Sequence, residues 1–111
     1  MGLGIRWALP AEQSADAILS YIADENAQAA QLLYSKLMEA IEHASVYPEI
    51  ARFIPELGTN YRELVSVRPF RVIYRIVEDE LWIIAMMRME QDFAPERFLD
   101  IQPTAPPASR R

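Results

Sequence analysis

Arginine is the residue type in this sequence that is best suited to binding chemistry. Lys36 is the only lysine among eleven basic residues, and the other ten are arginines. A guanidinium group presents a planar set of donors that fits carboxylates and phosphates, and it also stacks on aromatic rings. Residues 49–100 hold seven arginines against ten acidic residues, whereas residues 1–48 hold two cations against six acids. The second half of the chain is therefore the expected recognition surface.

A metal-independent ribonuclease could be assembled from three residues in this half. Arg71 and Arg88 would stabilise the charge of a phosphorane, and Glu90 would act as the base. The rest of the inventory is poor, because His43 is the only histidine, cysteine is absent and the three glycines form no phosphate-binding loop. A net charge of −5 also disfavours general binding to nucleic acid. We predict no cofactor or metal site, and whether the chain is an enzyme stays open.

The elements that must position these residues fit one small domain. The chain has 111 residues, of which 51% are hydrophobic, and this composition suits a single core. Its apolar runs fall far short of the roughly 20 residues of a membrane helix, and the N-terminus does not read as a signal peptide. We expect a soluble, cytoplasmic protein without membrane contact. Residues 1–100 are the predicted domain, and the proline-rich residues 101–111 are predicted to be a disordered tail.

The spacing of apolar residues predicts the order of the elements. Residues 5–9 alternate as in a strand that Pro10 ends, and spacings of three and four predict helices over 11–24 and 27–47, with Asn26 as N-cap of the second. Residues 48–60 read as an irregular connection. Strands are predicted over 61–67, 70–77 and 81–89, with a turn at 78–80. The expected fold is α+β with the order β-α-α-β-β-β, in which an antiparallel sheet packs against an N-terminal helical hairpin.

The last two predicted strands carry apolar side chains on both faces. Strict alternation separates one set, Phe70, Val72, Tyr74 and Ile76, from another, Arg71, Ile73, Arg75 and Val77. It likewise separates Trp82, Ile84, Met86 and Arg88 from Leu81, Ile83, Ala85, Met87 and Met89. A helical hairpin covers only one face. The other face either binds a partner, to which the methionines would adapt, or is covered by residues 48–60 and a short helix around 95–99.

Several short motifs together resemble one known group of proteins. They are Ala15-Asp16 and residues 21–23 in the first predicted helix, Pro48 at the end of the second, Arg-Glu-Leu-Val at 62–65, Pro-Phe-Arg-Val-Ile-Tyr-Arg-Ile at 69–76 and Gln-Asp-Phe at 91–93. On these motifs, residues 5–98 resemble the ParE/RelE superfamily of toxins. The resemblance implies a type II toxin that a cognate antitoxin protein neutralises within a hetero-oligomer.

Within that superfamily the resemblance leaves the cellular target open. RelE-like members cleave messenger RNA on the ribosome, whereas ParE-like members inhibit DNA gyrase without obvious catalytic residues. Arg71 matches the arginine that contacts the scissile phosphate in RelE-like nucleases, but no nuclease histidine or tyrosine follows Arg88, which favours the ParE-like alternative. A toxin-like interaction module without toxicity is the third possibility. The expected contacts to the target or antitoxin are Arg62, Arg71, Ile73, Arg75, Val77, Arg88, Met89, Gln91 and Phe93.

Overall fold

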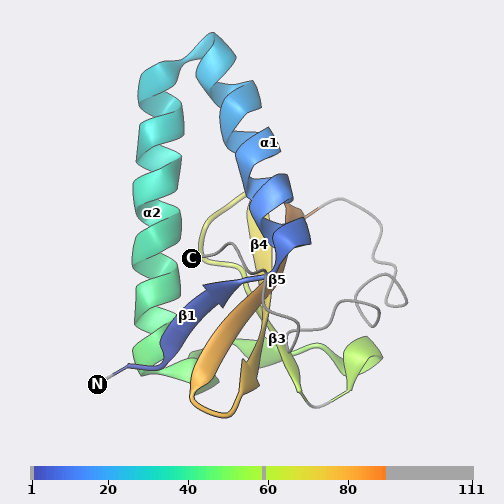
Figure 1. Ribbon diagram of the computed structural model, residues 1–111. Coiled ribbons are helices and arrows are strands. Elements are labelled where there is room, and N and C mark those ends of the chain that lie inside the picture. Colours follow the sequence, from blue (N-terminus) through green and yellow to red (C-terminus); the bar gives the residue numbers. More distant parts are fainter. Residues whose placement is uncertain (1, 59, 90–111) are drawn as a thin grey trace.

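Two helices form a hairpin on one face of a five-stranded sheet (Figure 1). The computed structural model describes residues 2–58 and 60–89. Its elements are β1 (Gly4–Trp7), α1 (Leu9–Glu25), α2 (Ala27–Val46), the 3₁₀ turn η1 (Pro48–Ile50), β2 (Arg52–Phe53), the 3₁₀ turn η2 (Pro55–Leu57), β3 (Tyr61–Leu64), β4 (Phe70–Val77) and β5 (Glu80–Arg88). The α+β class and the helical hairpin are confirmed. The helix expected around 95–99 and the tail 101–111 lie outside the described residues.

The sheet is mixed, which corrects the expectation of an antiparallel one. Its strand order is β1-β5-β4-β3-β2, and β1 runs parallel to β5 while the other pairs are antiparallel. The hairpin of α1 and α2 crosses one face and carries the chain from the edge formed by β1 to the opposite edge, where β2 lies. The chain then returns strand by strand, and β5 pairs with β1. Parallel neighbours require such a crossover, and residue patterns within a strand do not encode which strands become neighbours.

A proline and an asparagine define the ends of the hairpin. Pro10 lies in the first turn of α1 instead of ending a strand, because its fixed φ suits a helix start and its missing N–H is not needed there. Asn26 caps α2 as predicted, and its Oδ1 accepts a hydrogen bond of 3.0 Å from the backbone N–H of Ala29. The backbone N–H of Asn26 also closes α1 by donating to the carbonyl of Ile22. One residue therefore ends the first helix and begins the second.

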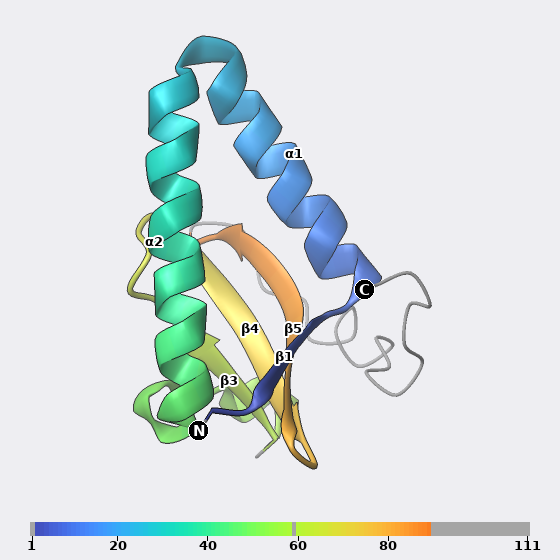
Figure 2. The ribbon, with the colours of Figure 1, turned by 60° about the vertical axis from the view of Figure 1, so that its left-hand side comes forward.

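The main core lies between the hairpin and the sheet. Its helical side includes Ala11 and Ala15 of α1 and is completed by buried residues of α2. Figure 2 shows α1 running across the sheet above β5, and the small alanines allow this close approach. The buried members of this core are Ala11, Ala15, Leu37, Ile41, Ala44, Ala51, Leu64, Phe70, Val72, Tyr74, Leu81, Ile83 and Met86.

A β-bulge changes which side chains of β5 face the helices. Ile73 pairs with Ala85 and Tyr74 pairs with Ile83, so Ile84 is an extra residue in β5. One extra residue reverses the alternation beyond it. Met86 consequently joins the main core, whereas Ala85 and Met87 pack with the opposite cluster. The strict alternation expected for residues 81–89 is therefore wrong beyond Ile84.

The second face of the sheet is covered in part by the chain itself. Ile54 and Leu57 pack there against Ile73, Trp82 and Ile84, with Tyr61 in the same cluster. Ile73 and Ile84 are both 0% exposed. Of the two alternatives left open by the sequence, coverage by residues 48–60 therefore holds for this part of the face.

Candidate functional site

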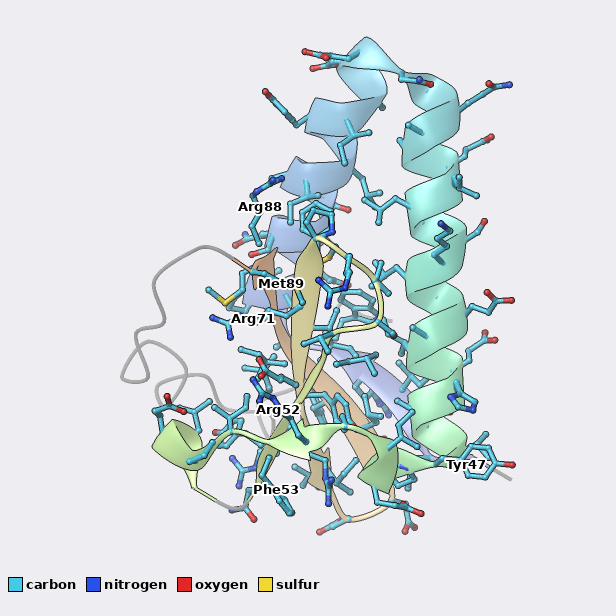
Figure 3. The ribbon with its side chains drawn as sticks, turned by 180° about the vertical axis from the view of Figure 1, so that it is seen from behind. Tyr47, Arg52, Phe53, Arg71, Arg88 and Met89 are labelled. Carbon is cyan, nitrogen blue, oxygen red and sulfur yellow. The ribbon has the colours of Figure 1, made fainter. Side chains whose placement is uncertain are left out.

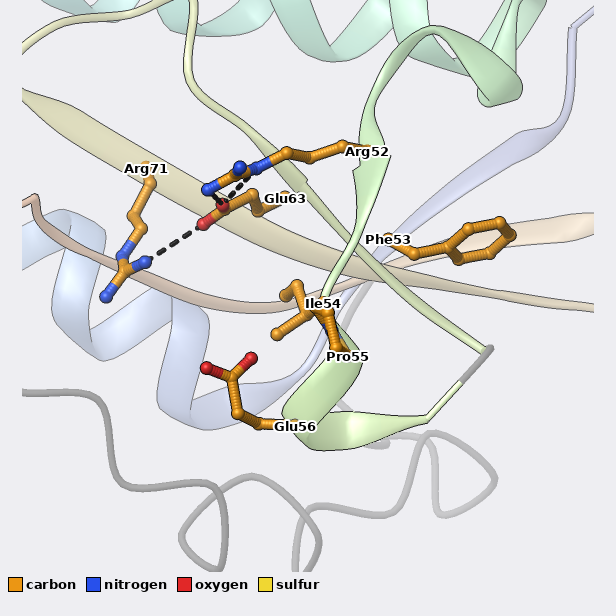
Figure 4. A pocket seen from close by; sticks show the side chains of 7 residues that line it. All are labelled: Arg52, Phe53, Ile54, Pro55, Glu56, Glu63 and Arg71. Carbon is orange, nitrogen blue, oxygen red and sulfur yellow. Dashed lines mark hydrogen bonds and ion pairs between the residues drawn. The ribbon is translucent and has the colours of Figure 1, made fainter.

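A buried carboxylate of β3 holds one arginine of β2 and one of β4. Glu63 of β3 is 4% exposed, and its Oε1 accepts a hydrogen bond of 3.0 Å from Nη1 of Arg71. Its Oε2 accepts one of 2.7 Å from Nε of Arg52 (Figure 4). The strand register explains this geometry, since Arg52 lies directly opposite Glu63 and Ile73 is the β4 partner of Glu63, which places Arg71 on the diagonal. Two guanidinium groups thus neutralise one carboxylate that water hardly reaches.

The space beside this cluster is a pocket of about 300 Å³, which we call the Glu63 pocket. Figure 4 shows Glu56 on its far wall, so the lining carries two guanidinium groups and two carboxylates. Such a balanced lining attracts a free phosphate poorly, because the positive charge is already matched. The lining residues are Arg52, Phe53, Ile54, Pro55, Glu56, Glu63 and Arg71.

Arg62 and Tyr74 fasten the segment 48–53 to the helix-side face of the sheet. Nη1 of Arg62 donates to the carbonyl of Ala51 at 2.5 Å, and its guanidinium lies 4.0 Å above the ring of Phe53. The hydroxyl of buried Tyr74 donates to the carbonyl of Pro48 at 2.7 Å. Burial raises the pKa of Tyr74 to about 12, an effect that the positive charge of Arg62 partly opposes. Both side chains therefore have a structural task within the described residues.

Arg75 and Arg88 contact aromatic rings on opposite faces of the sheet. On the second face, Nη1 of Arg75 donates to the hydroxyl of Tyr61 at 3.3 Å, and its guanidinium lies 5.3 Å from the ring centre. Exposed Arg88 lies 5.5 Å from the ring centre of Phe70, its direct cross-strand partner, and therefore shares the helix-side face with that ring.

Arg71 and Arg88 consequently do not converge on one point. Both lie where β4 begins and β5 ends (Figure 3), but successive residues of a strand point to opposite faces, so Arg71 leaves the face that Phe70 and Arg88 share. Met89 lies beside them, and its backbone N–H donates to the carbonyl of Pro69 at 2.9 Å. The pair suggested for phosphorane stabilisation is thus divided by the sheet.

The other predicted contact residues have different surroundings. Ile73 is fully buried, and Val77 is half-buried at the end of β4. Glu90, Gln91 and Phe93 lie outside the described residues. Glu63 was not among the predicted contacts. By strand alternation it shares a face with Tyr61 and Val65, and a carboxylate on such a face could have signalled a buried ion pair.

Two kinds of feature are absent from residues 2–58 and 60–89. These residues include no group of three or more histidine, aspartate or glutamate side chains that could hold a metal ion. None of the helices described there is long and apolar enough to cross a membrane.

The helical hairpin over a mixed sheet is also the fold of a chain from a known toxin–antitoxin system. A chain of the chromosomal ParDE toxin–antitoxin system from P. aeruginosa shares it with a TM-score of 0.64 and 21% identity, over 79% of this chain and 97% of that one. A mutant of the E. coli toxin RelE in the free state aligns with a TM-score of 0.47 and 14% identity, over 81% and 86% of the two chains.

The sequence itself identifies the family. The model of the ParE toxin of type II toxin–antitoxin systems, parDE, matches residues 5–93. The chain therefore belongs to the ParE toxin family. Among curated protein sequences, none matches it.

Proposed function

We propose that this ParE-family protein is a toxin of the bacterial cytoplasm that inhibits DNA gyrase by binding it, and that a cognate antitoxin neutralises it. Membership of the family supports the toxin role. The observation that carries the choice of a binding mechanism over RNA cleavage is the ion pair between Arg71 and buried Glu63. An arginine already matched by a carboxylate is poorly prepared to receive the charge that develops on a phosphorane.

The surroundings of the arginines also favour binding over catalysis. A general base must come within hydrogen-bonding distance, about 3 Å between heavy atoms, of the group from which it removes a proton. His43 is exposed on α2, where its ring lies 5.1 Å from that of Tyr47, and it belongs to a different element from Arg71 and Arg88. Arginine and aromatic side chains are, by contrast, the types that dominate binding energy at protein interfaces.

Exposed apolar side chains support the expectation of protein partners. Eight large ones are about half exposed or more in the described residues. Exposed apolar side chains mark a partner site where they gather in one patch. One group follows the end of α2, and its Tyr47 and Phe53 appear at the lower rim of the molecule in Figure 3. The eight are Leu9, Tyr21, Leu32, Tyr34, Val46, Tyr47, Ile50 and Phe53.

A supercoiling assay with purified gyrase tests the proposal. The wild-type protein should inhibit supercoiling, and an excess of the cognate antitoxin should restore it. The variant R88E should inhibit about tenfold more weakly, since it reverses an exposed charge beside Phe70. The matched control R6E changes an arginine that pairs with Glu80 elsewhere in the sheet, and it should inhibit like the wild type.

Two results would contradict the gyrase proposal. Discrete cuts in translated messenger RNA, with gyrase unaffected, would establish the RelE-like nuclease instead. Normal growth of cells that express the protein without antitoxin, together with unaffected gyrase, would support an interaction module without toxicity.

A further inference from the structure

One edge of the sheet has no neighbouring strand within residues 2–58 and 60–89. β1 comes first in the strand order and pairs with β5 alone (Figure 1). The backbone N–H groups of Gly4 and Ala8 donate to carbonyls at β5, at 3.0 Å and 2.9 Å. Because backbone N–H groups alternate sides along a strand, those of Ile5 and Trp7 point away from β5. They form what we call the outer edge of β1, at which another strand can pair.

The outer edge of β1 lacks the features that usually prevent pairing between edge strands. Proline, lysine and bulges are common protections of such edges. β1 contains neither proline nor lysine, and its register with β5 is regular over all four residues. Its one charged residue, Arg6, is matched, because its Nε donates to Oε2 of Glu80 at 2.9 Å. Neither sequence nor charge therefore protects this edge.

A second copy of this chain fits the outer edge in one antiparallel register. With Ile5 of the two copies facing each other on a twofold axis, Leu3 of each copy lies opposite Trp7 of the other. These three side chains are only partly buried, and all of them pack on the helix-side face. Pairing would therefore cover apolar surface on that face and supply partners for the outward N–H groups of Ile5 and Trp7.

Gly4 allows an arginine of the second copy to reach a carboxylate. In this register Gly4 lies opposite Arg6 of the other copy. Glu80 is the β5 partner of Gly4, and its Oε2 lies 3.9 Å from the position that a Cβ atom at residue 4 would take. Since Gly4 has no side chain, the space between the incoming guanidinium and Glu80 is open. The side chain of Glu80 is 34% exposed, so it has room for a second arginine.

Charge selects this register over the neighbouring one. A shift that places Arg6 on the twofold axis would set two guanidinium groups directly opposite each other, which is destabilising. The register with Ile5 on the axis instead places each Glu80 between an arginine of its own chain and an arginine of the other copy. The edge is thus complementary to itself, as a twofold homodimer requires.

We propose that two copies of this chain pair along the outer edges of β1, so that their five-stranded sheets join into one continuous sheet. The paired strands have only four residues each, and such a contact lies at the small end of specific interfaces. The dimer is therefore reversible, with a dissociation constant in the micromolar range. This inference goes beyond the proposed function and does not require gyrase to be the target.

Sedimentation velocity of the full-length protein without antitoxin tests the proposal. Across the micromolar range it should show a reversible equilibrium between monomer and dimer. The buffer contains salt at about 0.15 M, which screens the repulsion between two copies of charge −5 beyond about 8 Å.

Two variants with the same change of charge localise the contact. G4R places an arginine opposite Arg6 of the other copy and fills the open space, so it should raise the dissociation constant at least about tenfold. A Cβ atom at residue 4 makes only ordinary contacts within one copy, so the G4R monomer should fold. A17R adds the same charge at an exposed position of α1 and should dimerise like the wild type. Circular dichroism should show that both variants are folded.

A single cysteine tests the register. The sequence contains no cysteine, so I5C supplies the only thiol. Directly opposite residues of a hydrogen-bonded antiparallel pair have Cα atoms about 5.5 Å apart, which is within the range of a disulfide. Oxidised I5C should therefore run as a covalent dimer on a non-reducing gel. L32C carries its thiol at an exposed position of α2 and should cross-link much more slowly.

Three results would overturn the proposal. These are a monomer at every concentration, equal dimerisation of G4R and A17R, and cross-linking of I5C that is no faster than that of L32C. The gyrase proposal is tested separately, because β1 pairs with residues 80–83 of β5 whereas Arg88 ends that strand. G4R should therefore inhibit gyrase like the wild type, and failure of one proposal leaves the other standing.

Discussion

The helical hairpin and the sheet half, residues 48–88, handle charge in opposite ways. The sheet half contains six arginines and six carboxylates and is neutral overall. Arg52 and Arg71 share Glu63 there, and Arg62 is held by backbone carbonyls. The hairpin instead concentrates acidic residues and has a single lysine.

This difference separates structural charge from charge available to a partner. Five of the six arginines in the sheet half fasten strands and turns to one another, because each of the five has a carboxylate, a carbonyl or a ring within reach. A charge already engaged inside the fold contributes less to an external contact. An arginine-rich segment therefore does not guarantee an arginine-rich recognition surface. The acidic hairpin has the larger net charge of the two halves.

The largest expected effect concerns packing in the sheet. I84A should lower the free energy of unfolding by about 3 kcal/mol, because Ile84 is fully buried against Ile54 and Leu57. L32A, at an exposed position of α2, should change it by less than about 0.5 kcal/mol. Urea unfolding followed by circular dichroism measures both. Equal costs would mean that residues 48–60 do not cover the second face in solution.

A middle-sized effect is expected at the buried carboxylate. E63A should cost about 2 kcal/mol, because it removes the acceptor shared by Arg52 and Arg71. E39A removes an exposed carboxylate of α2 and should be nearly neutral. The same unfolding experiment compares them. If E63A were as stable as E39A, the contrast between structural and available charge would fail.

The smallest expected effect on the free energy of unfolding comes from the hydroxyl group of Tyr74, and it depends on pH. Y74F should cost about 1 kcal/mol at neutral pH, since it removes the hydrogen bond to the carbonyl of Pro48. The pKa of Tyr74 is raised from its ordinary 10 to about 12, so the unfolded chain loses this proton first. The contribution of Tyr74 is therefore complete below pH 10 and is lost as the pH rises toward 12.

Ultraviolet absorbance and unfolding curves across this pH range measure both parts of the Tyr74 prediction. The wild type should show one late phenolate transition that Y74F lacks, and its stability should fall more steeply between pH 10 and pH 12. If the additional phenolate of the wild type formed near the ordinary pKa of 10 instead, Tyr74 would be in contact with water.

Local signals in the sequence identified most of the elements. The cap at Asn26 and the bounds of β4 follow from residue types and alternation within a few positions. The apolar stripes of both helices also depend only on spacing. These features depend on residues that are close together in the sequence, so the sequence alone is enough to predict them.

Features that depend on contacts between distant segments could not be predicted from the sequence. The parallel pairing of β1 with β5 joins residues more than seventy positions apart. The bulge at Ile84 depends on the register between β4 and β5. Because of this one extra residue, Met86 faces the main core and not the second face of the sheet. The pairing of Arg71 with Glu63 likewise requires the register of β3 and β4. Counting arginines could not distinguish a fastening role from a binding one.

The pairing of β1 with β5 has a consequence for synthesis of the protein. A ribosome must deliver almost the entire described chain before Gly4–Trp7 can find their neighbours in β5. Contacts between distant segments form slowly, because the intervening chain must first be brought to order. Nascent fragments that end before residue 80 therefore lack a completed sheet, and β1 gains its neighbour only after β5 has been synthesised.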